Sequence, residues 1–154
     1  MRPKLRSILI PAVLVAGAGL GFLNAQPNRI SVYTFSRDSE KHLNDERLDT
    51  FRRELGEYAE PVMELAYSRE RAHVTVLYLG QGRLAVELDE AGLALRHLWT
   101  PDEKAKKMWA VLRMGNFSKE FSQSGSGGRD LGRLAKSIGD WLQANSTVIR
   151  EQMP

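Results

Sequence analysis

Three histidines, His42, His73 and His97, are the side chains best suited to bind a metal ion or to move a proton near neutral pH. Their positions form neither an H-x-H nor an H-E-x-x-H motif, so no spacing brings two imidazoles together. The chain has no cysteine, which excludes a thiol nucleophile, a disulfide scaffold and a cysteine-bound zinc site. We therefore predict that no metal ion and no cofactor is bound.

Serine offers a second route to chemistry. Ser126 has glycine on both sides, but the sequence is G-S-G rather than the G-x-S-x-G of a nucleophile elbow. Gly127 to Gly132 has the spacing of a phosphate-binding loop, yet Arg133 and Leu134 stand where that loop requires Lys and Ser or Thr. No catalytic residue is predicted. An exported hydrolase that uses Ser or His stays an alternative, and it requires a histidine within hydrogen-bond reach of a Ser, Asp or Glu in a cleft.

Basic residues gather late in the chain, where the formal net charge is +4 from residue 91 onward and −4 over residues 26–90. Lys104, Lys106 and Lys107 are predicted to lie on the outward face of one helix, and Arg129 at the start of another. These four residues are candidate contacts for an anion or an acidic partner. The simpler interpretation is a helix whose lysines keep it soluble.

The opening of the chain has the composition of a membrane-targeting segment. Arg2, Lys4 and Arg6 precede a stretch without charge over residues 7–28, of which residues 8–23 are almost purely apolar. A basic flank before such a stretch is typical both of a secretory signal peptide and of a single-pass membrane anchor.

These two interpretations of residues 1–25 differ in the fate of the segment after synthesis. A signal peptide would be cleaved after Ala25, whereas a signal anchor would stay in the membrane through residues 7–25. Gly17 and Gly21 form the GxxxG spacing that lets two transmembrane helices pack closely, which favours the anchor.

In both cases the basic flank stays in the cytoplasm, so residues 26–154 are predicted to form a single extracytoplasmic α+β domain. The absence of cysteine fits a bacterial exported domain, located in the inner membrane with its C-terminal part in the periplasm or outside. The alternative is a secreted or periplasmic protein, cleaved after Ala25. Without the three N-terminal charges the chain has 19 basic and 19 acidic residues, which argues against a nucleic-acid partner.

The first half of this domain begins with a strand at residues 30–35, rich in β-branched and aromatic residues. A helix capped by Asn44 comes next, and its apolar stripe is Leu48, Phe51, Leu55, Tyr58 and Val62. Alternating patterns then predict strands at residues 73–79, 84–88 and 93–99. Short glycine-containing connections suggest that these three strands form an antiparallel meander.

The second half is predicted to be helical. Thr100-Pro101-Asp102-Glu103 has the residues of a capping box, and apolar residues come after it at helical spacing: Ala105, Met108, Trp109 and Leu112. Residues 116–128 indicate a mobile loop, and a last helix begins near Asp130. The predicted fold class is α+β, with an antiparallel three- to four-stranded sheet, helices packed on one face and a preceding N-terminal hydrophobic helix.

These features predict a membrane-anchored or exported, non-enzymatic domain that acts as an accessory or protein-binding subunit of an envelope complex. One alternative is a periplasmic module that binds a small ligand between the sheet and its helices, in a cavity lined by residues such as Val76, Tyr78 and Leu95. The Ser/His hydrolase is the other alternative.

Overall fold

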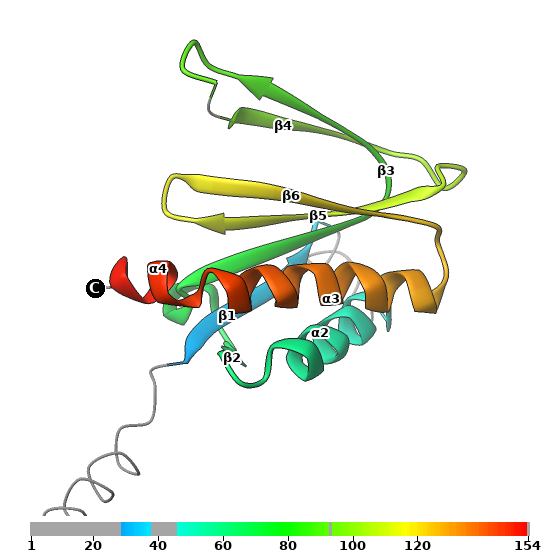
Figure 1. Cartoon of the computed structure of the whole chain (residues 1–154). Helices are drawn as coiled ribbons and strands as arrows, with labels where there is room; N and C mark the ends of the chain where they lie inside the picture. The colour runs from blue at the N-terminus through cyan, green and yellow to red at the C-terminus, as the bar shows by residue number, and fades with distance from the viewer. Residues whose placement is uncertain (1–28, 38–45, 93, 154) are drawn as a thin grey trace, which may run out of the picture.

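The structure, a computed structural model, describes residues 29–37, 46–92 and 94–153 (Figure 1). Its elements in chain order are β1 (Ile30–Ser36), α2 (Glu46–Ala59), β2 (Met63–Leu65), the 3₁₀ turn η1 (Arg69–Arg71), β3 (Val74–Leu88), β4 (Ala94–Pro101), β5 (Lys107–Met114), β6 (Phe117–Ser124), α3 (Gly128–Ala144) and α4 (Ser146–Glu151).

The strands form one six-stranded mixed sheet that curls strongly into a half-barrel. Five strands are arranged in the order β2-β1-β3-β5-β6, and β4 pairs with the second half of β3. β1 runs parallel to β2 and β3, whereas the other pairs are antiparallel. The parallel pairs arise because the chain leaves β1 by a crossover through α2 rather than by a hairpin.

The predicted fold class is therefore wrong. An antiparallel sheet of three to four strands was expected, but the sheet is mixed, because two segments predicted as helix and loop are strands and because β1 joins it in parallel. No N-terminal hydrophobic helix precedes the sheet within the described residues, and the apolar segment at residues 8–23 lies outside them. No described helix is both long and apolar enough to cross a membrane.

β3 is one continuous strand of 15 residues that changes partners along its length. Its first half lies between β1 and β5, and its second half, from Gly82 to Leu88, pairs with β4. A hairpin at residues 80–82 was predicted, but Gly80, with a φ of 78°, lies at a bulge and the strand continues through it. The bend carries the β3–β4 hairpin over the open face of the sheet (Figure 1).

Gly82 is required at this bend because the ring of Trp99 packs over it. A side chain at residue 82 would meet that ring, and its Cβ would lie 2.5 Å from the Thr100 carbonyl oxygen. On the other side of the bend, Nε1 of Trp109 donates a hydrogen bond of 3.1 Å to the Gly82 carbonyl. Two tryptophans therefore fix the angle between the hairpin and the rest of the sheet.

β5 occupies the segment predicted as a helix. Met108 and Leu112 are buried against the helices, while Val111 is buried on the opposite face, next to the half-buried Trp109. A central strand with apolar residues on both faces reproduces the i, i+3, i+4, i+7 spacing of a helix. Of the predicted cap at residues 100–103, Thr100 and Pro101 are the last residues of β4. A turn follows, in which the Asp102 carboxylate accepts a 3.0 Å hydrogen bond from the Lys104 N–H.

β6 occupies most of the segment predicted as a mobile loop. Its serines lie on an edge strand, which pairs with β5 alone among the described strands. Phe121 anchors β6 to the helical side, because its ring meets the edge of the Trp141 ring on α3 at 6.2 Å between centroids. A serine-rich sequence is thus compatible with a strand where one face is exposed and one aromatic side chain is buried.

The hydrophobic core lies between the convex face of the sheet and the helices α2 and α3. The structure confirms the predicted strand at residues 30–35, the helix that contains Leu48 and the last helix, which contains Asp130. Of the predicted stripe of α2, Leu48, Phe51 and Leu55 are buried, whereas Tyr58 is 38% exposed and Val62 lies beyond the end of the helix. The core also contains, from α3, Leu131, Leu134, Ala135, Ile138 and Leu142.

Candidate functional site

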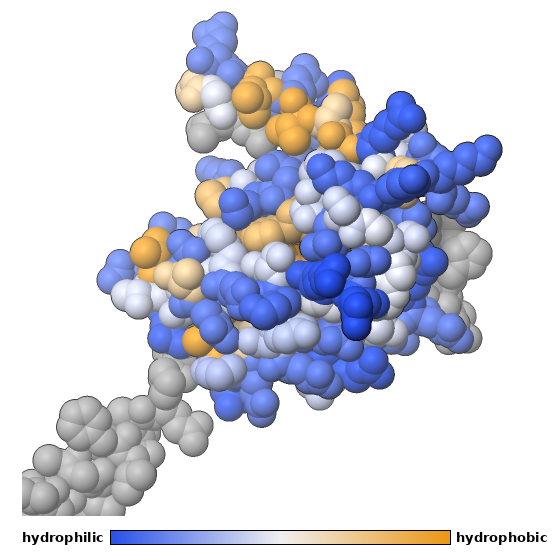
Figure 2. All heavy atoms as spheres, turned by 45° about the vertical axis from the view of Figure 1, so that its right-hand side comes forward, coloured by the Kyte–Doolittle hydropathy of each residue, from blue (hydrophilic) through white to orange (hydrophobic). Residues whose placement is uncertain are grey.

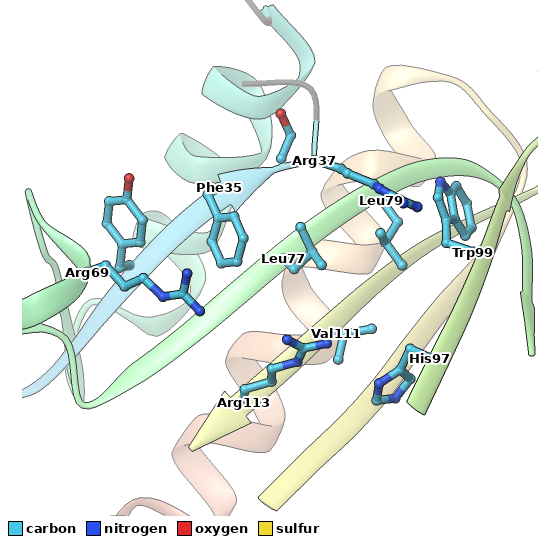
Figure 3. Close-up of a pocket in the computed structure, with 11 residues that line it drawn as sticks. Phe35, Arg37, Arg69, Leu77, Leu79, His97, Trp99, Val111 and Arg113 are labelled. Carbon is cyan, nitrogen blue, oxygen red and sulfur yellow. The ribbon is translucent and has the colours of Figure 1, made fainter. Parts of the chain in front are cut away.

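The concave face of the sheet, opposite the helices, forms an open cleft of about 490 Å³ (Figure 3). Its apolar floor consists of Phe35 from β1, Leu77 and Leu79 from β3, and Val111 from β5. These residues alternate along their strands with residues of the core, so each strand supplies one face to the core and the other to the cleft. The volume falls within the range of small-molecule binding sites.

One wall of the cleft is the β3–β4 hairpin. His97 and Trp99 line the cleft from β4, and the register pairs them with Val86 and Leu84 of β3. Val86 and Leu88 therefore share their face of the hairpin, and both are exposed. Figure 2 shows apolar residues gathered on this hairpin, with a hollow between the hairpin and the rest of the domain.

Three arginines border the cleft: Arg37 after β1, Arg69 on η1 and Arg113 on β5. Figure 3 shows the side chains of Arg69 and Arg113 extending over the floor from different elements. The guanidinium of Arg69 lies over the Phe35 ring, 5.3 Å from its centroid, a cation–π contact that orients it. Within the described residues, none of the three forms an ion pair with a carboxylate.

Arginines elsewhere in the described part of the chain often do form ion pairs. Such pairs join Arg52 to Asp49, Arg53 to Glu54, Arg83 to Asp102, Arg96 to Glu87 and Arg133 to Asp130. Among the described residues, the cleft arginines thus place positive charge that has no ion-pair partner beside an apolar surface, where the field of a charge is screened less than in open water.

A carboxylate near the cleft is already engaged. Glu120 on β6 is in hydrogen-bond contact with His97, Oε1 to Nε2, across the open side of the half-barrel. The side chain of His97 is only 9% exposed, whereas that of Glu120 is 29% exposed. This contact ties the wall of the cleft to the sheet.

Two histidines bear on the hydrolase alternative. His97 contacts a carboxylate, but no hydroxyl of the described residues hydrogen-bonds to it, so no nucleophile completes the pair. Nδ1 of His73 lies 2.6 Å from the Ser31 hydroxyl, which also lies 2.8 Å from the Arg71 carbonyl oxygen. Ser31 is only 6% exposed, and this contact secures the chain after η1 against β1, while Ser31 and His73 each line a surface hollow. The hydrolase alternative stays a prediction.

A metal site is not assembled by the residues that the structure describes, since no three His, Asp or Glu side chains converge there. His42 lies outside the described residues. On α3, a hydrogen bond from Nζ of Lys136 to Asp140 raises the pKa of Lys136 above the ordinary 10.5. This lysine lies outside the cleft.

The basic residues singled out from the sequence lie at one end of the sheet. Lys104 and Lys106 are in the β4–β5 turn, Lys107 begins β5, and Arg129 lies in the first turn of α3. The predicted helix face that would carry the three lysines does not exist. Lys107 shares a face of β5 with Arg113, and its Nζ lies 4.7 Å from the centroid of the Trp109 ring. None of the four lines the cleft.

Their role as contacts for an anion or an acidic partner stays a prediction, as does helix packing through Gly17 and Gly21, which lie outside the described residues. Sequence analysis missed the cleft arginines because Arg69 and Arg113 are far apart in the chain. A usable signal was present in residues 74–79, where the apolar run VTVLYL indicates a strand covered on both faces.

Comparison of the chain with models of known protein families, with curated proteins and with solved structures finds no match.

Proposed function

We propose that this domain is a non-enzymatic binding module that holds a small ligand with an apolar body on the concave face of its curled sheet. The observation that carries the proposal is the open apolar floor of the cleft, where Phe35, Leu77 and Leu79 are partly exposed beside the buried Val111, and where Trp99 forms part of the wall. A surface of this kind gains free energy when an apolar group replaces water on it. In location the domain is proposed to be exported, anchored in the bacterial inner membrane or released from it.

The position of the open cleft favours binding on the concave face of the sheet over binding between the sheet and the helices, which the sequence predicted. A cavity between the sheet and the helices was expected near Val76, Tyr78 and Leu95, but Val76 and Tyr78 are buried within the packed core. The apolar cleft on the opposite face takes the place of that cavity in the proposal.

The test is a titration with the uncharged fluorescent probe N-phenyl-1-naphthylamine. Leu77→Trp fills the centre of the floor and is expected to weaken probe binding by about tenfold or more, which corresponds to about 1.4 kcal/mol. The matched control is Leu98→Trp, because Leu98 is 45% exposed on the outer face of the hairpin. Equal affinity in the wild type and both variants, or no binding of the probe, would contradict the proposal.

A second candidate function is protein binding as an accessory subunit of an envelope complex. It is favoured by Leu98 and Leu88, which are 45% and 57% exposed, and by the edge of β4 that faces away from β3. A free edge and apolar side chains suit the addition of a partner's strand. Cross-linking in whole cells through a photoreactive residue at position 88 should then give one stoichiometric adduct, which the added substitution Leu98→Lys should abolish.

A further inference from the structure

We infer that the ligand of the cleft is an anionic amphiphile, whose carboxylate or phosphate headgroup is bound by Arg69 and Arg113 while its apolar part lies on the floor. This inference rests on the proposed binding function and adds the chemical class of the ligand. It excludes neutral apolar molecules as the preferred occupants.

The positions of the two arginines carry the first step. Arg69 projects from η1 beyond the β1 side of the floor, and Arg113 projects from β5 on the other side. Both side chains extend over the cleft and line it (Figure 3). A guanidinium group offers a planar set of N–H donors that matches the two oxygens of a carboxylate or phosphate.

The fixed orientation of Arg69 is the second step. Its contact with the Phe35 ring restrains the side chain before any ligand arrives, so binding loses less side-chain entropy. At the base of η1, the Ser31 hydroxyl bonds to the Arg71 carbonyl and the His73 N–H bonds back to that hydroxyl at 3.2 Å. The backbone that carries Arg69 is thereby tied to β1.

The charge around the cleft is the third step. Among the described side chains that line the cleft, the charged ones are Arg37, Arg69 and Arg113, apart from the titratable His97. The carboxylate of Glu120 contacts His97 at the wall of the cleft. An anion that enters therefore meets three arginines that have no ion-pair partner among the described residues, next to an apolar floor, which matches an amphiphile with a negative head.

The experiment measures displacement of N-phenyl-1-naphthylamine from the full chain by octanoate, octyl phosphate and 1-octanol. In the wild type, octanoate and octyl phosphate are each expected to bind at least about tenfold more tightly than octanol. In the double variant Arg69→Gln/Arg113→Gln, all three should bind with similar affinity, and octanol should bind as it does to the wild type. The matched control is Arg133→Gln, since Arg133 lies on α3 and pairs with Asp130.

The possible results distinguish a failure of the anionic ligand class from a failure of the proposed binding function. If octanol binds as tightly as the two anions in the wild type, or if Arg133→Gln weakens the anions as much as the double variant does, the anionic class is wrong while the binding module stands. If the probe and all three ligands fail to bind, the proposed function fails and the inference falls with it. A preference for octyl phosphate over octanoate, or the reverse, identifies the headgroup.

Discussion

His97 of β4 contacts Glu120 of β6 although these two strands are not neighbours in the sheet. Among the described strands β4 pairs with β3 alone and β6 with β5 alone. This side-chain contact spans the open side of the half-barrel and sets how far the hairpin stands from the floor of the cleft.

We predict that Glu120→Ala loosens the hairpin without unfolding the domain. The loss of a hydrogen bond that involves a charged, partly buried group lowers the free energy of unfolding by about 1–2 kcal/mol. Hydrogen exchange of the β4 amides should accelerate more than that of β1. Glu87→Ala is the control on the same hairpin, because Glu87 pairs with Arg96 at the surface. Identical β4 exchange in the two variants would argue against this role for the His97 contact.

The bend of β3 predicts a strong response at Gly82. Gly82→Ala places a methyl group against the Trp99 ring and the Thr100 carbonyl, and overpacking of this kind costs about 1–3 kcal/mol. Thermal unfolding measures the change. Gly128→Ala is the comparison, since nothing lies within 4 Å of a Cβ there and alanine favours the helix. If Gly82→Ala is as stable as Gly128→Ala, Trp99 does not pack as described.

Salt is predicted to weaken anion binding selectively. Raising the ionic strength from about 0.1 M to about 1 M shortens the Debye length from about 10 Å to about 3 Å. The affinity for octanoate should fall several-fold because the charges of Arg69 and Arg113 become screened. The affinity for 1-octanol should stay the same or rise slightly, since salt does not weaken apolar burial. Parallel losses for both ligands would show that charge plays no part in the selectivity.

Export is predicted from the N-terminal segment alone. N-terminal sequencing of the protein from membrane and soluble fractions distinguishes the intact anchor, which retains residues 1–25, from a cleaved product that begins at Gln26. A reporter enzyme fused to the C-terminus should be active only outside the cytoplasm. Activity confined to the cytoplasm would remove the proposed location and leave the cleft unaffected.

How far the sequence could predict the fold depended on whether local patterns were ambiguous. The strand at residues 30–35 and the last helix were predicted correctly, and so were Leu48, Phe51 and Leu55 as the buried stripe of α2, whereas Tyr58 and Val62 were assigned to that stripe wrongly. Residues 105–112 were not predicted correctly, because a strand buried on both faces has apolar residues at helical spacing as well. Gly80 and Gly82 resemble a hairpin turn locally, and only the packing of Trp99 and Trp109 shows that they bend a continuous strand.

The candidate site was less accessible to prediction for a different reason. Arg69 and Arg113 come together through the parallel pairing of β1 with β3, and this pairing leaves no signal at either arginine. The clustered lysines at residues 104–107 are conspicuous in the sequence, yet they lie in a turn and at a strand end outside the cleft. Charged residues that are neighbours in the sequence could be identified from the sequence, whereas the two arginines, which line the same cleft only in the folded domain, could not.

The most direct measurement of the central claim is the set of nuclear Overhauser effects between the alkyl chain of bound octanoate and the methyl groups of the protein. If the concave face binds the ligand, the contacts will be to Leu77 and Leu79, which are partly exposed on the floor of the cleft. Contacts to the core methyls of Val76 and Leu112, or to Leu98 on the outer face of the hairpin, would contradict it.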